Sequence, residues 1–477
     1  MTRKKSWLKL ALILVVVFAA AGAFFGWYKF FREVPQSPFA NDEMRFKYGS
    51  FGVENDAGIP YWIWVVLPRM FPEYLPGPGG YRSMGMVWEQ GEELPVGFTK
   101  KTVGFPRVGN NCAVCHAASY RTKHDENPKV VAAGPGHTAN IQAFLRFVSR
   151  SAKDPRFNAR EILSEIDLIY DLPWIDRLLY RFIIIPFTKK ALTEREGQFA
   201  WMNRSGWPDW GPGRDDPMNL TKYFMTQLPV DDTIGNTDFP SIWNLKIRDG
   251  KPLQWDGSTP IARAVIMDSA LGMQARKNDE FLKHMDWLDE WLKALPPPKY
   301  PLAIDDGLAA RGKSIFDERC GSCHGWGQGP RAGSLIDIAE IGTDRERLDS
   351  WTQEGADKAN EVRTRMGVNI ANMVKTNGYI AVPLHGLWLR GPYLHNGSVP
   401  TVRDLLEEPD KRPKVFYRGY DVLDAKKLGF ISSGAQAERA GFRYDTAQRG
   451  NGNGGHLYGI DLTEADKDAL VEYLKTQ

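Results

Sequence analysis

Apolar residues form one long run near the start of the chain, and further along they recur every three to four residues in shorter segments. The first run extends from Leu8 to about Tyr28. At roughly 20 residues it is long enough to cross about 30 Å of hydrocarbon as a helix. Arg3, Lys4 and Lys5 precede it, and basic residues of this kind stay on the cytoplasmic side of a membrane. The pattern predicts a transmembrane helix with the bulk of the chain outside the cytoplasm.

A signal sequence is the alternative interpretation of this run, because the small residues AAAGA at 19–23 could form a cleavage site. The apolar stretch nevertheless continues through Phe24, Phe25, Trp27 and Tyr28, and such aromatic residues are typical of a membrane interface. We therefore favour an uncleaved anchor and tether over residues 1–40. This predicts a single-pass protein of the inner (cytoplasmic) membrane, with most of the chain in the periplasm.

Two segments in the middle of the chain have the period of an amphipathic helix. The first reads HTANIQAFLRFVSRSA, residues 137–152. The second reads DEFLKHMDWLDEWLKAL, residues 279–295, and it places the following residues on one face: Phe281, Met285, Leu288, Leu292 and Leu295. The prolines at 296–298 cannot continue a helix. We place a domain boundary there, which gives an N-terminal domain over 41–298 and a C-terminal domain over 299–477.

The C-terminal domain is predicted to begin and end with a helix. DDGLAARGKSIFDERC, residues 305–320, forms the first. LTEADKDALVEYLKTQ, residues 462–477, forms the last, with Thr463 as its N-cap and Leu470, Val471 and Leu474 facing inward. Strand signals are weak and scattered, so the fold is predicted to be mainly α with long irregular loops.

The apolar run RLLYRFIIIPF at 177–187 is too short to span a bilayer. We predict a buried core helix that ends at Pro186. The alternative is a segment that rests on the membrane surface.

Composition narrows the class of protein. An apolar fraction of 43% and an aromatic fraction of 12% are those of a well-packed globular chain. The net charge of +3 is small for 477 residues, and no long basic run is present. The sequence therefore argues against a nucleic-acid partner.

All four cysteines lie in two short segments, CAVCH at 112–116 and CGSCH at 320–324. The pattern Cys-x-x-Cys-His is that of covalent haem c attachment, in which two thiols bind the haem vinyl groups and the imidazole ligates the iron. With 8 histidines in the chain, one follows a given cysteine pair by chance roughly one time in 60. We predict two haems c, one on Cys112, Cys115 and His116, and one on Cys320, Cys323 and His324.

Three other interpretations of the cysteines fit less well. A disulfide scaffold would spread its cysteines to join distant loops. A zinc site built from two Cys-x-x-Cys segments usually has them about 15–20 residues apart, and here about 200 residues separate them. A thioredoxin-like motif would need a βαβ pattern, which the sequence lacks.

The function depends on the sixth ligand of each iron, because a closed site transfers electrons whereas an open one binds small oxidants. For the second haem the candidates are His385, His395 and His456. His456 lies in GNGNGGHLYG, whose glycines let the backbone approach a flat cofactor closely. Arg390, near His395, could hold a haem propionate.

For the first haem, His124 and His137 follow His116 closely. His137 lies in AAGPGHTAN, where it could cap the next helix or lie near the haem. No methionine stands in a convincing ligand loop, and Met202, Met218 and Met225 are better explained by packing. We therefore predict an open or weakly ligated first haem.

Several segments together resemble the di-haem cytochrome c peroxidase superfamily, and within it the branch of the di-haem rubber oxygenase. The resemblance covers roughly residues 100–477 and rests on these segments: FPSIWNL (239–245), LQWDGSTP (253–260), VPLHGLWLRGPYLHNGSVPTVRDLL (382–406) and GGHLYGIDLTEADKDALVEYLKT (454–476). It implies two cytochrome-c-like haem domains behind the anchor. It further implies that Trp255 lies between the haems and relays electrons, and that His456 is the distal ligand of the second haem.

The resemblance also implies oxygen or peroxide chemistry at the first haem, and a calcium ion between the domains. Asp231, Asp232 and Asp256 are available acidic residues. Two departures qualify it: His116 and Trp255 are further apart than in short peroxidases, and a histidine stands where peroxidases use a methionine ligand. We therefore carry forward two hypotheses. One is a haem-dependent oxidoreductase of the peroxidase or oxygenase type. The other is a pure electron carrier. Both would exchange electrons with a periplasmic or membrane partner.

Overall fold

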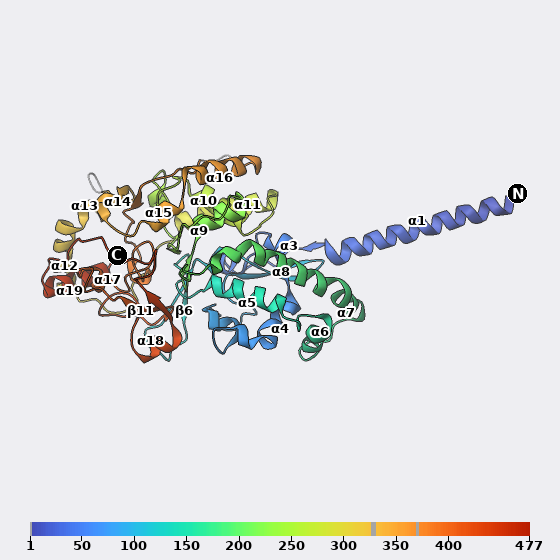
Figure 1. Ribbon diagram of the computed structural model, residues 1–477, viewed down its shortest axis with the longest axis horizontal. Coiled ribbons are helices and arrows are strands. Elements are labelled where there is room, and N and C mark those ends of the chain that lie inside the picture. The colour runs from blue at the N-terminus through green and yellow to red at the C-terminus, as the bar shows by residue number, and fades with distance from the viewer. Residues whose placement is uncertain (1, 326–330, 369–371) are drawn as a thin grey trace.

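Helix α1 (Thr2–Phe30) projects as a single rod from the body of the molecule (Figure 1). The computed structural model describes residues 2–325, 331–368 and 372–477. Within these residues, Trp7–Phe30 is the one helix that is long and apolar enough to cross a membrane, and its most apolar stretch is not buried inside the structure. A signal sequence near the N-terminus would have the same properties, so the uncleaved anchor stays a prediction.

A four-stranded antiparallel sheet lies between α1 and the first cysteine pair. Its strands stand in the order β1-β3-β4-β2: β1 (Glu33–Val34), β2 (Ile59–Pro60), β3 (Phe98–Val103) and β4 (Phe105–Asn110). Gly104 joins β3 to β4 with a φ of +72°, a conformation that glycine adopts without strain. Three short helices pack around the sheet: α2 (Asp42–Tyr48), α3 (Val53–Asp56) and α4 (Tyr61–Met70). The sequence analysis did not predict this sheet.

A layer of helices follows the first cysteine pair: α5 (Ile141–Lys153), α6 (Ala159–Asp167), α7 (Trp174–Leu179) and α8 (Ile185–Phe199). The predicted helix over 137–152 is confirmed as α5, which begins where the Asn140 side chain accepts a hydrogen bond from the Ala143 backbone N–H. Phe147 and Val148 are buried on its inner face.

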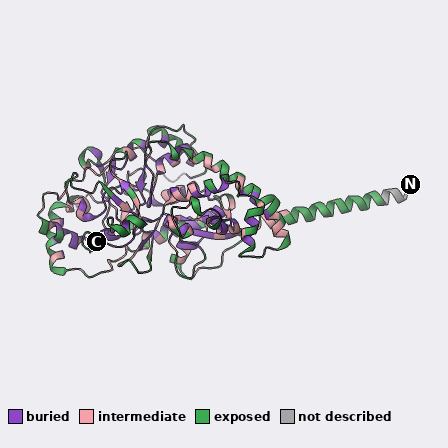
Figure 2. Cartoon of the chain, turned by 60° about the horizontal axis from the view of Figure 1, so that its bottom comes forward, coloured by how far each residue is buried: buried purple, intermediate pink, exposed green. Residues whose placement is uncertain are grey.

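The prediction of a buried helix that ends at Pro186 is wrong. α7, a π-helical turn (Tyr180–Ile184) and α8 follow one another without a break, and Pro186 lies in the first turn of α8. The π-helical turn directly before Pro186 interrupts the regular α-helical pattern of backbone hydrogen bonds, and a residue without an N–H is accommodated next to it. Only one side of this helical segment is buried, since Phe182 is 68% exposed and Phe187 is 70% exposed. Figure 2 shows that α1 is likewise coloured as exposed along most of its length.

The central part of the chain combines short strand pairs with two longer helices: β5 (Ala117–Tyr120), β6 (Lys129–Ala132), β7 (Arg214–Asp215), α9 (Pro217–Asn219), β8 (Thr237–Asp238), α10 (Ala262–Gly272) and α11 (Asp279–Ala294). The predicted helix over 279–295 is confirmed as α11. Phe281, Met285, Leu288 and Leu292 are all buried on its inner face. The helix ends just before the proline run, because prolines lack the backbone N–H that would continue the helical hydrogen bonds.

The C-terminal part is built on two helices that cross closely, α12 (Asp306–Arg319) and α19 (Glu464–Leu474). They meet at Gly312, where a Cβ atom would lie 1.9 Å from the Ala469 carbonyl oxygen, so only glycine fits. The predicted cap is confirmed, since the Thr463 side chain accepts a hydrogen bond from the Asp466 backbone N–H.

Apart from the 13-residue α16 (Gln353–Arg365), the remaining C-terminal elements are short: α13 (Gly321–His324), β9 (Leu335–Asp337), α14 (Ile338–Ile341), α15 (Glu346–Ser350), β10 (Gly378–Ile380), α17 (Val402–Leu405), β11 (Val415–Arg418), α18 (Ala435–Ala440) and β12 (Phe442–Asp445). The predicted mainly helical class with long loops is confirmed. The largest cluster of buried apolar residues contains Phe46 and Met285 as well as Trp388 and Leu470. Residues before and after position 298 thus share one core, and the division into two haem domains remains a prediction.

Candidate functional site

The second Cys-x-x-Cys-His segment is wound into one helical turn at the end of α12. The backbone N–H groups of Cys323 and His324 both donate to the Cys320 carbonyl oxygen, at 3.1 and 3.0 Å. Residues three and four apart lie on the same face of such a turn. The local fold therefore presents two thiols and one imidazole to the same side.

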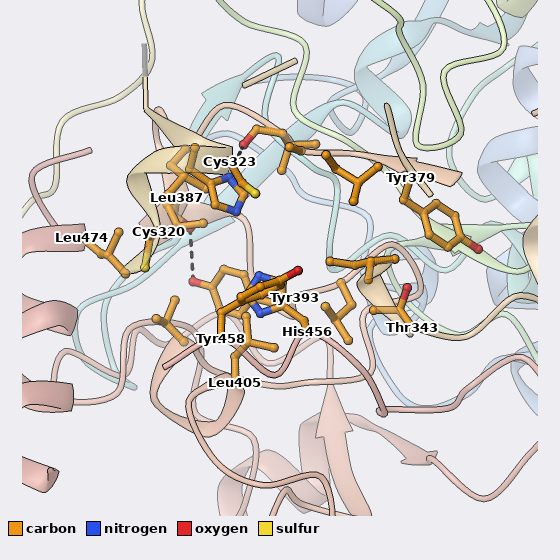
Figure 3. A pocket seen from close by; sticks show the side chains of 18 of the residues that line it. Cys320, Cys323, Thr343, Tyr379, Leu387, Tyr393, Leu405, His456, Tyr458 and Leu474 are labelled. Carbon is orange, nitrogen blue, oxygen red and sulfur yellow. Dashed lines mark hydrogen bonds between the residues drawn. The ribbon is translucent and has the colours of Figure 1, made fainter. Parts of the chain in front are cut away.

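These three side chains line a pocket whose empty space, including its open mouth, is about 1390 Å³. Its apolar lining comes from many elements: Phe316, Ile336, Ile341, Leu384, Leu387, Leu405, Leu406, Leu470 and Leu474. Cys320 and Cys323 enter the pocket from one side and His456 from the other (Figure 3).

The rings of His324 and His456 face each other across this pocket, with centroids 6.3 Å apart. Two imidazole nitrogens that bind one metal from opposite sides at about 2.0 Å, each with its ring centroid about 1.1 Å behind, would put the centroids roughly 6.2 Å apart. His324 Nδ1 lies 3.0 Å from the Val382 carbonyl oxygen. It donates to that oxygen, which leaves Nε2 free to bind a metal. The two imidazoles therefore have the spacing of a pair of axial ligands.

Burial makes both imidazoles neutral at physiological pH. It lowers the pKa of His324, and it lowers the pKa of His456 to about 3, with the nearby His324 as a further cause. A neutral imidazole is the form that binds a metal ion.

The loop that carries His456 is held tightly. Gly455 has a φ of +73°, and a Cβ atom there would lie 2.3 Å from the Gly342 carbonyl carbon. The His456 backbone N–H donates to the Ile341 carbonyl oxygen at 2.8 Å, and buried Arg412 donates to the carbonyl oxygens of Asn453 and Gly455. The glycines thus allow the close backbone approach expected from the sequence.

His395, the alternative ligand, lines the same pocket but has other partners. Its ring stacks on Tyr379 with centroids 3.9 Å apart, and its Nε2 lies 3.0 Å from the Tyr379 hydroxyl. His456, rather than His395, pairs with the ring of His324.

Arg390 is a half-buried cation on the wall of the pocket. It donates to the Pro383 carbonyl oxygen, and no carboxylate of the described residues is among the charges that act on it. Burial and the nearby Arg248 lower its pKa to about 10. A guanidinium that is partly withdrawn from water gains from a nearby anion, so the pocket suits a cofactor that carries carboxylates.

The first Cys-x-x-Cys-His segment follows directly from β4. The Asn111 side chain accepts a hydrogen bond from the Ala113 N–H and donates to the carbonyl oxygens of Phe46 and Gly49. It thereby fixes the turn on which Cys112 begins. His116 is held like His324, since its Nδ1 lies 2.9 Å from the Pro240 carbonyl oxygen.

Cys112, Cys115 and His116 of this first segment are half-buried. Burial lowers the pKa of His116 to about 4 and raises that of the Cys112 thiol to about 12. His137 is buried and stacks on Phe430, with centroids 4.1 Å apart. His124 Nδ1 lies 2.6 Å from the Tyr420 hydroxyl. Neither contact involves His116.

A structural repeat connects the two segments, and the sequence analysis missed it. WDGSTP at 255–260 and HNGSVP at 395–400 occupy corresponding turns. Each turn is closed by a single antiparallel bridge, Leu253 to Thr259 and Tyr393 to Val399. Positive φ angles recur at the same places: Gln254 (62°), Gly257 (69°), Leu394 (69°) and Gly397 (62°).

Each turn also accepts an equivalent backbone hydrogen bond from a segment in the other half of the chain. The Asp238 N–H donates to the His395 carbonyl oxygen at 2.8 Å, and the Ile380 N–H donates to the Trp255 carbonyl oxygen at 2.9 Å. Asp238 stands two residues before Pro240, whose carbonyl oxygen accepts from His116. Ile380 stands two residues before Val382, whose carbonyl oxygen accepts from His324. The arrangement is that of two related units packed against each other.

Trp255 lies at the junction of these units. Its side chain lines the pocket of His324, and its indole N–H donates to the Asp238 carbonyl oxygen at 2.7 Å. Two residues further on, the Pro240 carbonyl contacts His116. The indole thus lies on a short covalent and hydrogen-bonded route between the two histidines.

Other metal sites find no support in the described part of the chain, which contains no cluster of three or more His, Cys, Asp or Glu side chains suited to a metal ion. The three acidic residues considered for calcium pair with cations: Asp231 with Lys222, Asp232 with Arg204, and Asp256 with Arg347. A calcium ion remains a prediction.

Comparison with known proteins gives a coarse class. A family described as RoxA-like, cytochrome c-like matches residues 378–417, the segment with Val382, Arg390 and His395. Two uncharacterised proteins of Sinorhizobium fredii are similar to this chain. The first, y4iM, is 30% identical over 50% of this chain and 64% of its own length. The second, y4iJ, is 29% identical over 38% of this chain and 41% of its own.

The chain thus spans less than two thirds of either relative. The family match supports a cytochrome c-like protein, and such a domain implies covalently bound haem c with its iron.

Proposed function

We propose that the protein is a membrane-anchored periplasmic cytochrome with two haems c. Cys320 and Cys323 would bind the second haem, with His324 and His456 as its axial ligands. The observation that carries this assignment is the pair of opposed imidazoles, 6.3 Å apart, in the pocket that both cysteines line. The apolar walls fit a porphyrin, and Arg390, on which no carboxylate of the described residues acts, fits its propionates.

The first haem would bind Cys112 and Cys115, with His116 as its axial ligand. The repeat supports this assignment. His116 donates from Nδ1 to the Pro240 carbonyl oxygen, and His324 donates from Nδ1 to the Val382 carbonyl oxygen. Both carbonyls lie two residues after equivalent backbone hydrogen bonds, at Asp238 and Ile380. A second copy of a cofactor site is the simplest reason for such a duplication. This division corresponds to the predicted haem domains over 41–298 and 299–477.

Haem iron supplies one-electron chemistry and, where an axial position is open, a place for peroxide or dioxygen. We propose that the second haem only transfers electrons, since two imidazoles close it. The first haem would bind the oxidant, since the contacts of His124 and His137 are with Tyr420 and Phe430. The protein would then be a peroxidase-like or oxygenase-like oxidoreductase.

A pure electron carrier is the second candidate, because the buried His137 Nε2 has no hydrogen-bond partner in the described structure and could close the first site. Electron paramagnetic resonance of the ferric protein distinguishes the two. The oxidoreductase predicts one high-spin and one low-spin signal, of which the high-spin signal shifts on addition of cyanide. Two low-spin signals that ignore cyanide would establish the carrier.

Trp255 is proposed to relay electrons between the haems. Its indole N–H donates to Asp238, on the segment that leads to the Pro240 contact with His116. Trp255→Phe keeps an aromatic ring but removes the N–H and raises the oxidation potential of the side chain. We expect inter-haem transfer, followed by stopped-flow absorbance after partial reduction, to slow at least tenfold while both haems stay attached. Unchanged kinetics would remove the relay.

Arg390 is proposed to pair with a propionate of the second haem. Arg390→Gln removes a positive charge from the wall of the pocket, which would favour the ferric state. The midpoint potential of the second haem should fall by on the order of 50–100 mV, as expected for one charge at about 8–15 Å in a medium of intermediate dielectric constant. Arg390→Lys is the matched control and should keep most of the potential. Equal potentials in the wild type and Arg390→Gln in a redox titration would contradict this role.

A further inference from the structure

The segment after α6 exposes an unusual concentration of large apolar side chains. We call it the juxtamembrane apolar face, and it consists of Leu168, Ile169, Tyr170, Trp174, Leu178, Phe182, Ile183 and Phe187. Trp174, Phe182 and Phe187 are 72%, 68% and 70% exposed. At about 150–250 Å² per aromatic side chain, these three alone expose on the order of 400 Å². A patch of that size on a soluble surface usually marks an interaction site.

The helical geometry keeps this face continuous. Trp174, Leu178 and Phe182 are four residues apart, which aligns them along α7 and into the π-helical turn (Tyr180–Ile184). Phe182 and Phe187 are five apart, and a π-helical turn aligns residues at this wider spacing. On the opposite side of the same turn, Tyr180 and Ile184 are buried in the core. The π-helical turn thus preserves a single exposed apolar stripe.

The base of α1 is fixed beside this stripe. Lys29, in the last turn of α1, forms an ion pair of 2.5 Å with Asp176 in α7. Phe30 packs against Phe105, and Phe105 packs against Tyr180 of the π-helical turn. Figure 1 shows α6 and α7 next to the body end of α1. If α1 spans a bilayer, Trp27 to Phe30 lie at its surface, and Asp176 is then at the level of the lipid headgroups.

We propose that the juxtamembrane apolar face inserts into the outer leaflet of the bilayer that α1 spans, and so holds the body of the protein against the membrane. The occupant of the face is lipid rather than a second protein, because the face is continuous with the end of the anchor helix. Arg181 lies among the apolar residues and is exposed, as suits a cation that reaches lipid headgroups. The inference rests on the proposed membrane anchoring.

A fixed orientation would have a functional consequence. If α1 alone held the protein in the membrane, the body could tilt about the end of that helix. With α1 and the juxtamembrane apolar face both in the bilayer, the distance of each proposed haem from the membrane is fixed. A membrane-embedded electron donor would then always meet the same side of the protein.

Nitroxide labels at single introduced cysteines test this. Phe182→Cys and Phe187→Cys report on the face, Phe18→Cys in α1 is the reference for the bilayer interior, and Val415→Cys in β11, 41% exposed, is the reference for water. The labelled unsubstituted chain gives the background from native thiols. The full-length protein is reconstituted in vesicles of equal parts phosphatidylethanolamine and phosphatidylglycerol. The ratio of oxygen to nickel-chelate collision rates then measures depth.

We expect labels at 182 and 187 to give a ratio several-fold above that at 415 and approaching that at 18. A ratio equal to that at 415, in protein that resists an alkaline carbonate wash, would overturn the apolar face while leaving the anchor intact. Spin–spin broadening at 182 would overturn it in favour of a second copy. Loss of the chain in the wash would overturn the anchoring and this inference together.

Discussion

Replacing both Cys320 and Cys323 by serine is expected to halve the covalently bound haem of the purified protein. Each thioether bond to the haem forms from a cysteine thiol and a haem vinyl group, and the hydroxyl of serine does not form such a bond. The pocket of about 1390 Å³ would lose its cofactor. Its apolar walls would then be unsupported, and the C-terminal part should become markedly less stable. Pyridine haemochrome absorbance after acidic acetone extraction measures the haem that stays on the chain.

The matched control is the equivalent double substitution of Cys112 and Cys115. It should also leave one haem, and the two variants should lose different components of the redox titration. An undiminished haem content in either variant would show that the corresponding pair is not an attachment site.

The second large effect is expected for His456→Ala. The substitution removes one of the two imidazoles that face each other at 6.3 Å, so the iron at this site should lose its sixth ligand. The low-spin signal of one haem should convert to high spin, and that haem should acquire the ability to bind cyanide. The spectrum of the other haem should stay the same. Electron paramagnetic resonance at low temperature measures both changes.

His395→Ala is the control, because His395 lines the same pocket but pairs with Tyr379. It should leave the spin state unchanged. Conversion to high spin in this variant, with none in His456→Ala, would exchange the roles of the two histidines.

The elements that could be predicted from the sequence are those with a strong local signal. α5, α11, α12 and α19 have regular apolar spacing and side-chain caps at Asn140, Asn278, Asp305 and Thr463. Their boundaries depend on residues within one or two turns. They could therefore be located before any tertiary contact was known.

The sheet of β1 to β4 was not predicted because its signal is not local. β1 and β2 have two residues each, and they pair with residues of β3 and β4 far along the chain. The prediction of a buried helix over 177–187 failed for a different reason. An apolar run shows that burial is favourable, but it does not distinguish protein from lipid as the apolar environment.

At the candidate site, the cysteines and their histidines could be identified because a covalent motif is contiguous. The pairing of His324 with His456 depends on residues more than 100 positions apart. The glycine-rich surroundings of His456 and the family resemblance suggested it, but no local pattern could place the two rings opposite each other. The repeat of 255–260 in 395–400 was visible in the sequence, as WDGSTP and HNGSVP. Its significance emerges from the matching backbone angles and the exchanged hydrogen bonds.

Mass spectrometry of the intact, purified protein tests the central claim most directly. Two covalently bound haems predict a mass above that of the polypeptide by two units of about 616 Da, with no thiol available to an alkylating reagent. A polypeptide without either increment, or four cysteines that all react with the reagent, would contradict the account.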